Sequence, residues 1–229
     1  MSFLHSWRAC PIAVAMLTAA APPPPDPARE QLMARLDAAG DRFQRMSARV
    51  KQVSYTKVID DTSEQEGSIR IQKVRPGEIE GLVEFTNPDH KYYLFEKRTL
   101  DIYTPKIDTL QEIDLGQHGE ELDQFLSIGF GTTGRELAKS YQVDVASGNT
   151  VAGTTLVRLT PTAPEVKKYL SRIDLWLSDQ GYPVQEKLTE PSGDWVTVYY
   201  SAVSINPVLP PNSFKLPIKP TTKKEYPAR

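Results

Sequence analysis

Residues 129–134 read Gly-Phe-Gly-Thr-Thr-Gly, which matches the G-x-G-x-x-G pattern of dinucleotide-binding loops. That chemistry needs a strand before the first glycine, a helix after the last, and an acidic residue about 20 residues later. Here the preceding residues have helical spacing, and no acidic residue ends a strand at that distance. The sequence therefore argues against a dinucleotide site and predicts that the glycines join two short helices.

The histidines and serines do not form a catalytic pattern. His90 and His118 each lie beside a turn, without the spacing of paired zinc ligands. Ser127 and Ser140 lack the strand–turn–helix context of a nucleophile elbow. We expect neither a metal site nor a cofactor.

Two carboxylate pairs remain for acid–base chemistry, Glu120 with Glu121 and Glu64 with Glu66. Both are interpreted as solvated surface groups. A glycosidase-like pair stays open at this point, because the separation of two carboxylates is not visible in a sequence.

Arg75 is the polar residue that the sequence singles out. It ends a predicted strand, directly before Pro76 and near a predicted apolar interior. Its guanidinium carries five hydrogen-bond donors in a rigid fork, which could hold the exposed carbonyls of a helix in place. An ordinary surface arginine is the alternative.

The N-terminus resembles an export signal. Arg8 is the only charge among the first 25 residues, and an apolar stretch with small residues follows; this pattern predicts cleavage near Ala20 and a periplasmic product. Cys10, the only cysteine, lies at the start of the apolar stretch and would be removed, so we expect neither a lipid anchor nor a disulfide. Charge is balanced, with 27 Lys+Arg against 29 Asp+Glu, which disfavours nucleic-acid binding.

A helix is expected next. Asp26 can cap it and Pro27 suits its first position. One apolar stripe repeats at spacings of three and four, through Leu32, Leu36, Ala39, Phe43 and Met46.

After this helix the sequence predicts about eleven strands and one helical insert, Glu120–Ser140. The fold class is therefore mainly β, an antiparallel sheet with helices laid on it. The strands are expected at Val50–Thr62, Gly67–Val74, Glu78–Thr86, Lys91–Glu96, Thr99–Tyr103, Thr109–Leu115, Tyr141–Ala146, Thr154–Thr160, Arg172–Ser178, Pro183–Glu190 and Trp195–Ile205.

Several strands are apolar on both faces, for example Tyr92–Phe95, whereas a sheet covered on one side should alternate. Something must cover the second face, either an ordinary sandwich or barrel core or a ligand. Our cavity prediction follows the alternation of the third strand, and a register error of one residue would exchange its faces. It comprises Ile69, Ile71, Ile79, Val83, Phe85, Leu94, Leu122, Phe125, Leu126, Ile173, Leu175 and Leu177.

Several short segments, in order, resemble the LolA-like family of periplasmic lipoprotein carriers. Their order and spacing carry the resemblance, which covers about residues 28–218. The segments are Phe43 through Gln52, Lys73-Val74-Arg75-Pro76, Leu159-Thr160-Pro161, Ile173–Leu177 with Asp179-Gln180-Gly181 and Val184, and Phe214 with Pro217.

The resemblance implies an unclosed, half β-barrel of about eleven antiparallel strands with a helical lid. Acyl chains of lipoproteins would lie inside, and Arg75 would bond lid backbone and close the lid. Implied partners are acylated lipoprotein cargo, an inner-membrane lipoprotein-releasing ABC transporter and an outer-membrane receptor. The expected organisation is signal peptide 1–20, Pro-rich spacer 21–27, carrier-like domain 28–218 and tail 219–229.

The leading hypothesis is thus a periplasmic carrier that moves lipoproteins or related lipids from the inner to the outer membrane. A periplasmic regulatory module that senses lipid or protein is the alternative, although such regulators usually carry a further C-terminal domain and this chain ends soon after the barrel. An enzyme is disfavoured, because no nucleophile or metal cluster is visible.

Overall fold

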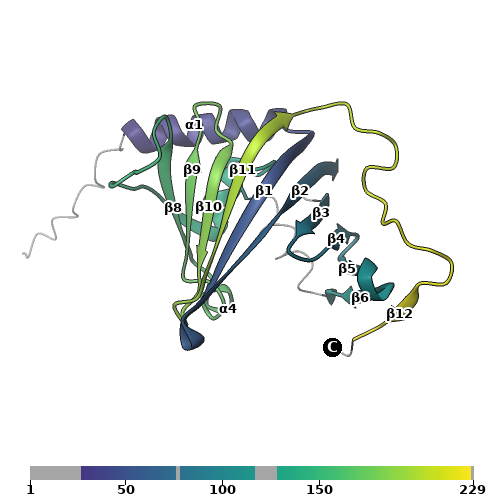
Figure 1. Cartoon of the computed structure of the whole chain (residues 1–229). Helices are drawn as coiled ribbons and strands as arrows, with labels where there is room; N and C mark the ends of the chain where they lie inside the picture. Colours follow the sequence, from purple (N-terminus) through teal and green to yellow (C-terminus); the bar gives the residue numbers. More distant parts are fainter. Residues whose placement is uncertain (1–26, 76–77, 117–127, 228–229) are drawn as a thin grey trace, which may run out of the picture.

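The computed structural model describes residues 27–75, 78–116 and 128–227 (Figure 1). The predicted signal peptide, most of the predicted spacer, and the predicted cavity residues Leu122, Phe125 and Leu126 lie outside these residues.

The described chain is one large sheet with a few helices. The helices are α1 (Pro27–Arg42), α3 (Gly134–Ser140) and α4 (Pro164–Lys167), and the 3-10 turns are η1 (Lys57–Ile59) and η2 (Pro105–Ile107). The strands are β1 (Arg45–Thr56), β2 (Asp61–Arg75), β3 (Glu78–Asn87), β4 (Lys91–Glu96), β5 (Thr99–Thr104), β6 (Thr109–Asp114), β7 (Tyr141–Val145), β8 (Thr155–Pro161), β9 (Arg172–Leu177), β10 (Pro183–Thr189), β11 (Trp195–Ile205) and β12 (Lys223–Glu225).

The sheet is open. Its twelve strands run in the order β12-β6-β5-β4-β3-β2-β1-β11-β10-β9-β8-β7, so β12 and β7 are edges that do not meet. Every neighbouring pair is antiparallel except β12 with β6. The predicted mainly-β, unclosed sheet is confirmed, with one strand more than expected.

Helix α1 lies across the ends of β8 to β11 (Figure 1). Leu32 and Leu36 pack with Leu137 of α3 and with the inner side chains of β7, β8 and β9, all buried. Near its C-terminus, Ala39 and the following Phe43 pack with β1, β2 and β3. One helix therefore covers part of the concave face on both sides of the sheet's middle.

Polar contacts fix α1 on the sheet. Arg29 Nε donates to the Val143 carbonyl at 3.1 Å, and the buried Tyr182 hydroxyl donates to the Ala39 carbonyl at 3.2 Å. The backbone N–H of Arg135 in α3 donates to Asp37 at 3.0 Å. Each contact joins α1 to a segment more than 90 residues away.

The apolar stripe predicted for the first helix extends beyond it. Helix α1 ends at Arg42, and Met46 lies in β1, which begins five residues before the predicted strand. Asn206 explains the stop: its side chain accepts from the N–H groups of Gln44 and Arg45 at 2.8 and 3.1 Å and donates to the Arg42 carbonyl at 3.0 Å. Both Phe43 and Met46 are fully buried. The spacing of three and four therefore predicted the buried positions correctly, but the helix that was predicted to carry them ends before both residues.

Three elements were not predicted from the sequence, and one of them, the turn η1, interrupts the predicted strand Val50–Thr62. Short helix α4 follows β8, and β12 forms from residues of the expected tail, pairing in parallel with β6. Thr222 Oγ1 donates to Asp108 at 2.8 Å and holds the start of this strand. The segment between β11 and β12 is traced at the right of Figure 1.

The glycines of the G-x-G-x-x-G pattern serve close packing. A Cβ on Gly131 would lie 2.8 Å from the Phe43 ring, and one on Gly134 would lie 3.0 Å from the Met33 carbonyl oxygen of α1. Gly131 also has a φ of +96°, which side chains rarely adopt. These glycines let the segment before α3 approach α1 closely.

Gly131→Ala should destabilise the protein by about 2–4 kcal/mol, because the methyl group meets both an unfavourable φ and the buried Phe43 ring. Gly148→Ala is the matched control, since its φ is +81° but nothing lies within 4 Å of the added Cβ; we expect a loss of about 1–2 kcal/mol there. Urea unfolding of both variants measures the difference. Equal losses would contradict a packing role for Gly131.

Candidate ligand-binding cavity

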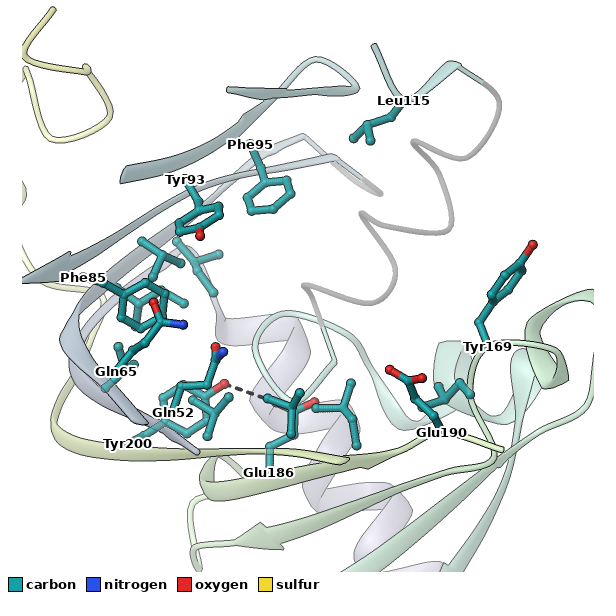
Figure 2. A pocket seen from close by; sticks show the side chains of 18 of the residues that line it. Gln52, Gln65, Phe85, Tyr93, Phe95, Leu115, Tyr169, Glu186, Glu190 and Tyr200 are labelled. Carbon is teal, nitrogen blue, oxygen red and sulfur yellow. Dashed lines mark hydrogen bonds between the residues drawn. The ribbon is translucent and has the colours of Figure 1, made fainter. Parts of the chain in front are cut away.

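The concave face holds a cavity of about 840 Å³, within the usual range for ligand sites. Figure 2 shows Phe85, Tyr93 and Phe95 on one side, Glu186 and Tyr200 at the base, and Tyr169 on the other side. The described lining residues are Val50, Gln52, Gln65, Ile69, Ile71, Val83, Phe85, Tyr93, Phe95, Leu115, Tyr141, Val166, Tyr169, Leu170, Glu186, Leu188, Glu190, Val196, Val198 and Tyr200.

Strand register decides which side chains reach the cavity. Val83 of β3 pairs with Ile69 of β2 and with Tyr93 of β4, and all three line the cavity. Because neighbouring residues on a strand point to opposite faces, Leu82 and its partner Leu94 point away from it. Both faces of β4 therefore carry apolar side chains, as the sequence indicated, whereas the opposite face of β3 also carries Glu78, Glu80 and Glu84.

The predicted cavity residues separate into three groups. Ile69, Ile71, Val83 and Phe85 line the cavity. Ile79 lies in the core with Phe43, and Ile173, Leu175 and Leu177 are buried in the core beneath α1 and α3. Leu94 is buried on the opposite face. Whether any of these residues contacts lipid stays a prediction.

Arg75 ends β2 and is exposed. Its guanidinium forms an ion pair with Glu78 of β3, and 72% of its side chain is accessible. Its role in closing a lid stays a prediction, because most of the insert implied as the lid lies outside the described residues.

Polar groups interrupt the apolar wall in one transverse row. Gln65 of β2 pairs with Gln52 of β1, Gln52 pairs with Val198 of β11, and Val198 pairs with Glu186 of β10. All four residues line the cavity. Neighbouring strands lie about 4.8 Å apart, so the row spans the floor, and the backbone of Glu186 lies two strands, or about 10 Å, from that of Gln52.

Glu186 is the buried carboxyl of this row, with 6% of its surface exposed. The Tyr200 hydroxyl donates to its Oε2 at 3.1 Å (Figure 2). Burial raises the pKa of Glu186 to about 7, and the hydrogen bond from Tyr200 opposes that rise only in part. Glu186 can therefore change charge near neutral pH.

The carboxyl of Glu186 in turn affects the tyrosines around it. Burial raises the pKa of Tyr200 well above 10, with a further increase from the charge of Glu186. Burial and the same carboxylate raise the pKa of Tyr141, on β7, above 10. Both hydroxyls remain protonated at neutral pH and can donate hydrogen bonds.

Sequence analysis missed Glu186. The signal was the alternation in β10, where Glu186 shares a face with Leu188 while Gln185 and Lys187 point the other way. The pattern does not reveal which face is inside, because both carry polar residues.

The described residues hold no group of three or more His, Cys, Asp or Glu side chains placed to bind a metal. Within the same residues, no helix is long and apolar enough to span a membrane.

No protein-family model and no curated protein matches the chain by sequence. Solved structures similar to it include an uncharacterised conserved protein from Thermus thermophilus. That likeness has a TM-score of 0.51 and 8% identity, and it covers 87% of this chain and 99% of that one. It shows a shared fold and nothing further.

Two more distant structures are also similar. A LolA superfamily protein from Nitrosomonas europaea is 12% identical with a TM-score of 0.39, over 82% of this chain and 97% of that one. The Pseudomonas aeruginosa MucA/MucB complex gives 15% identity and a TM-score of 0.45, over 82% of this chain and 61% of that one, so this chain spans less than two thirds of its length. No functional conclusion follows from either. The open half-barrel implied by the LolA-like resemblance is confirmed by the sheet itself.

The raised pKa of Glu186 predicts a specific pH dependence of stability. A carboxyl whose pKa rises from 4.5 unfolded to about 7 folded stabilises the fold below about pH 4.5, and this contribution is lost as pH rises through 7. Relative to Glu186→Gln, wild-type stability should fall by about 3 kcal/mol between pH 4.5 and 8. Urea unfolding across this range measures it.

Glu190→Gln is the control, because Glu190 lines the same cavity but is exposed; its pH profile should follow the wild type. Burial, followed by Glu112, raises the pKa of Asp101 to about 6, and that contribution is common to all variants. Parallel profiles for wild type and Glu186→Gln would contradict the assignment.

Proposed function

We propose that this protein is a periplasmic carrier that binds the acyl chains of lipoproteins or related lipids in its cavity and shuttles them from the inner to the outer membrane. The observation that supports the proposal most directly is the cavity of about 840 Å³ on the concave face. Its wall is mainly aliphatic and aromatic, and several of its residues, including Ile69, Ile71 and Phe85, also pack in the core around Phe43.

Burial of acyl chains supplies the binding energy. Each methylene taken from water contributes about 0.8 kcal/mol, so a chain with a dozen buried carbons gains on the order of 10 kcal/mol before the cost of ordering. Half-buried aromatic side chains such as Tyr93 and Phe95 offer flat surfaces for such chains. Fewer buried carbons, or a better apolar site on a receptor, would favour release.

The resemblance to LolA-like carriers supports the rest of the proposal. It implies acylated lipoprotein cargo, delivery from an inner-membrane ABC transporter, and transfer to an outer-membrane receptor. The N-terminal sequence, with its apolar stretch and small residues, supports export to the periplasm.

Native mass spectrometry of the mature protein, purified from periplasm without detergent, tests the proposal. We expect a bound acylated species that exchanges with added synthetic lipopeptide. Val83→Trp should reduce lipopeptide uptake at least tenfold, because the indole fills space beside Ile69 and Tyr93. Val203→Trp, at an exposed position on β11, is the control and should bind normally.

An apo mass with no lipopeptide uptake would overturn the carrier. Equal binding by both tryptophan variants would place the lipopeptide outside the cavity. Stable binding of acyl chains without transfer to an acceptor would favour a regulatory binding module instead.

Arg75→Leu is expected to leave lipopeptide loading within about twofold of wild type but to slow transfer to acceptor vesicles carrying the receptor. Glu78→Gln removes the ion pair that Arg75 makes in the structure. It therefore distinguishes a role of this ion pair in transfer from a role of Arg75 at another segment. If Arg75 acts on another segment, as the resemblance implies, Glu78→Gln transfers normally. Normal transfer by Arg75→Leu would contradict any role in release.

A further inference from the structure

Glu186 is unusual within the cavity that it lines. A buried carboxylate that has no compensating cation beside it costs several kcal/mol when it is charged. Among the described residues, the carboxyl of Glu186 receives a hydrogen bond from Tyr200 at 3.1 Å; burial raises its pKa, and this bond opposes the rise only in part. A hydrophobic residue in its place would make a better wall for acyl chains alone.

The charges around Glu186 determine which ligand groups could bind beside it. The charged residues among the described lining are Glu186 and Glu190, with no lysine or arginine in that set. A carboxylate or phosphate near Glu186 would therefore meet negative charge in a low-dielectric site, which is strongly unfavourable. A cation or a neutral donor would be favoured there.

Hydrogen-bonding partners for such a guest are already placed. The amides of Gln52 and Gln65 lie in the same transverse row as Glu186, and Figure 2 shows Gln52 beside Tyr200 and Gln65 beside Phe85. Gln52 Nε2 donates to Ser54 at 3.3 Å. The amide carbonyls can accept hydrogen bonds, as Glu186 does.

We propose that Glu186, Tyr200 and Gln52 form a headgroup site on the cavity floor. It takes a long-chain amphiphile whose buried polar group is a cationic or neutral hydrogen-bond donor, such as an amine, hydroxyl or amide N–H. Chains that end in a carboxylate or phosphate are rejected. This inference rests on the proposed function, because it assumes that the chain of the same guest lies against the apolar wall.

Displacement of the neutral fluorescent probe N-phenyl-1-naphthylamine tests the site with matched twelve-carbon guests at pH 8, where Glu186 is largely ionised. Dodecylamine should displace the probe from wild type at a concentration at least about tenfold lower than dodecanoate, and dodecanol should fall between them. This order reflects charge next to a buried carboxylate, since all three chains are equal in length.

In Glu186→Gln the ratio between dodecylamine and dodecanoate should fall to within about twofold, while dodecanol still displaces the probe. Glu186→Met, similar in length and uncharged, provides a second variant should the first fold poorly, and circular dichroism checks both. Glu190→Gln is the matched control and should keep most of the ratio, because that carboxylate is exposed.

The outcomes separate the two proposals. Equal displacement of the probe by amine and carboxylate in wild type overturns the headgroup site and leaves the carrier intact. Loss of the ratio in Glu190→Gln but not in Glu186→Gln also overturns it, since the rim charge would then be responsible. Failure of wild type to bind the probe or any chain overturns both the site and the carrier.

Discussion

The burial of the concave face is the constraint on which the structure depends. An open sheet whose concave face is apolar is stable in water only when that face is covered. Helix α1 and the segment through α3 cover one part, where Leu36, Leu137 and Leu175 are essentially inaccessible. The cavity lies next to this packing, along β2 to β4 and parts of β1, β10 and β11, and Ile69, Ile71 and Phe85 belong both to its wall and to the core around Phe43.

The boundary between core and cavity follows from the reach of a single helix. Helix α1 spans 16 residues, about 24 Å, which is shorter than a sheet of twelve strands is wide. It is joined to β7 by Arg29 and to the segment before β10 by Tyr182, so it cannot shift along the sheet to fill the cavity. The space is therefore a consequence of how the helix is held.

A polar row in an apolar cavity provides orientation as well as binding. Acyl chains gain energy from any apolar wall, but an apolar wall alone does not fix their direction. Gln52, Gln65 and Glu186 lie in register across the floor and give the cavity one polar level. Burial then makes each hydrogen bond there stronger than it would be in water.

Much of the sheet could be read from the sequence. The bounds of β4 and β11 agree with the prediction, and those of β5, β7 and β9 differ by one residue, because alternating β-branched and aromatic residues between turns are a local signal. The start of β1 was missed because Asn206, about 160 residues away, ends α1. Strand β12 was missed because it depends on pairing with an edge.

Some residues of the cavity could likewise be predicted from the sequence, and others could not. Periodicity in β2 and β3 determined that Ile69, Ile71, Val83 and Phe85 share a face, because the strand period is a property of the backbone. It could not distinguish a face covered by protein from one left to a ligand, and so Ile173, Leu175 and Leu177 were grouped with them. Nor could it predict that Glu186 meets Tyr200, since this contact depends on the register between β10 and β11. The sequence by itself predicted an export-like N-terminus and a mainly β sheet with several strands apolar on both faces, and the family resemblance predicted that the sheet is unclosed. Only the tertiary structure decided which part of that sheet is core, which part is cavity and where the buried carboxyl lies, because those depend on where α1 is held and how the strands align.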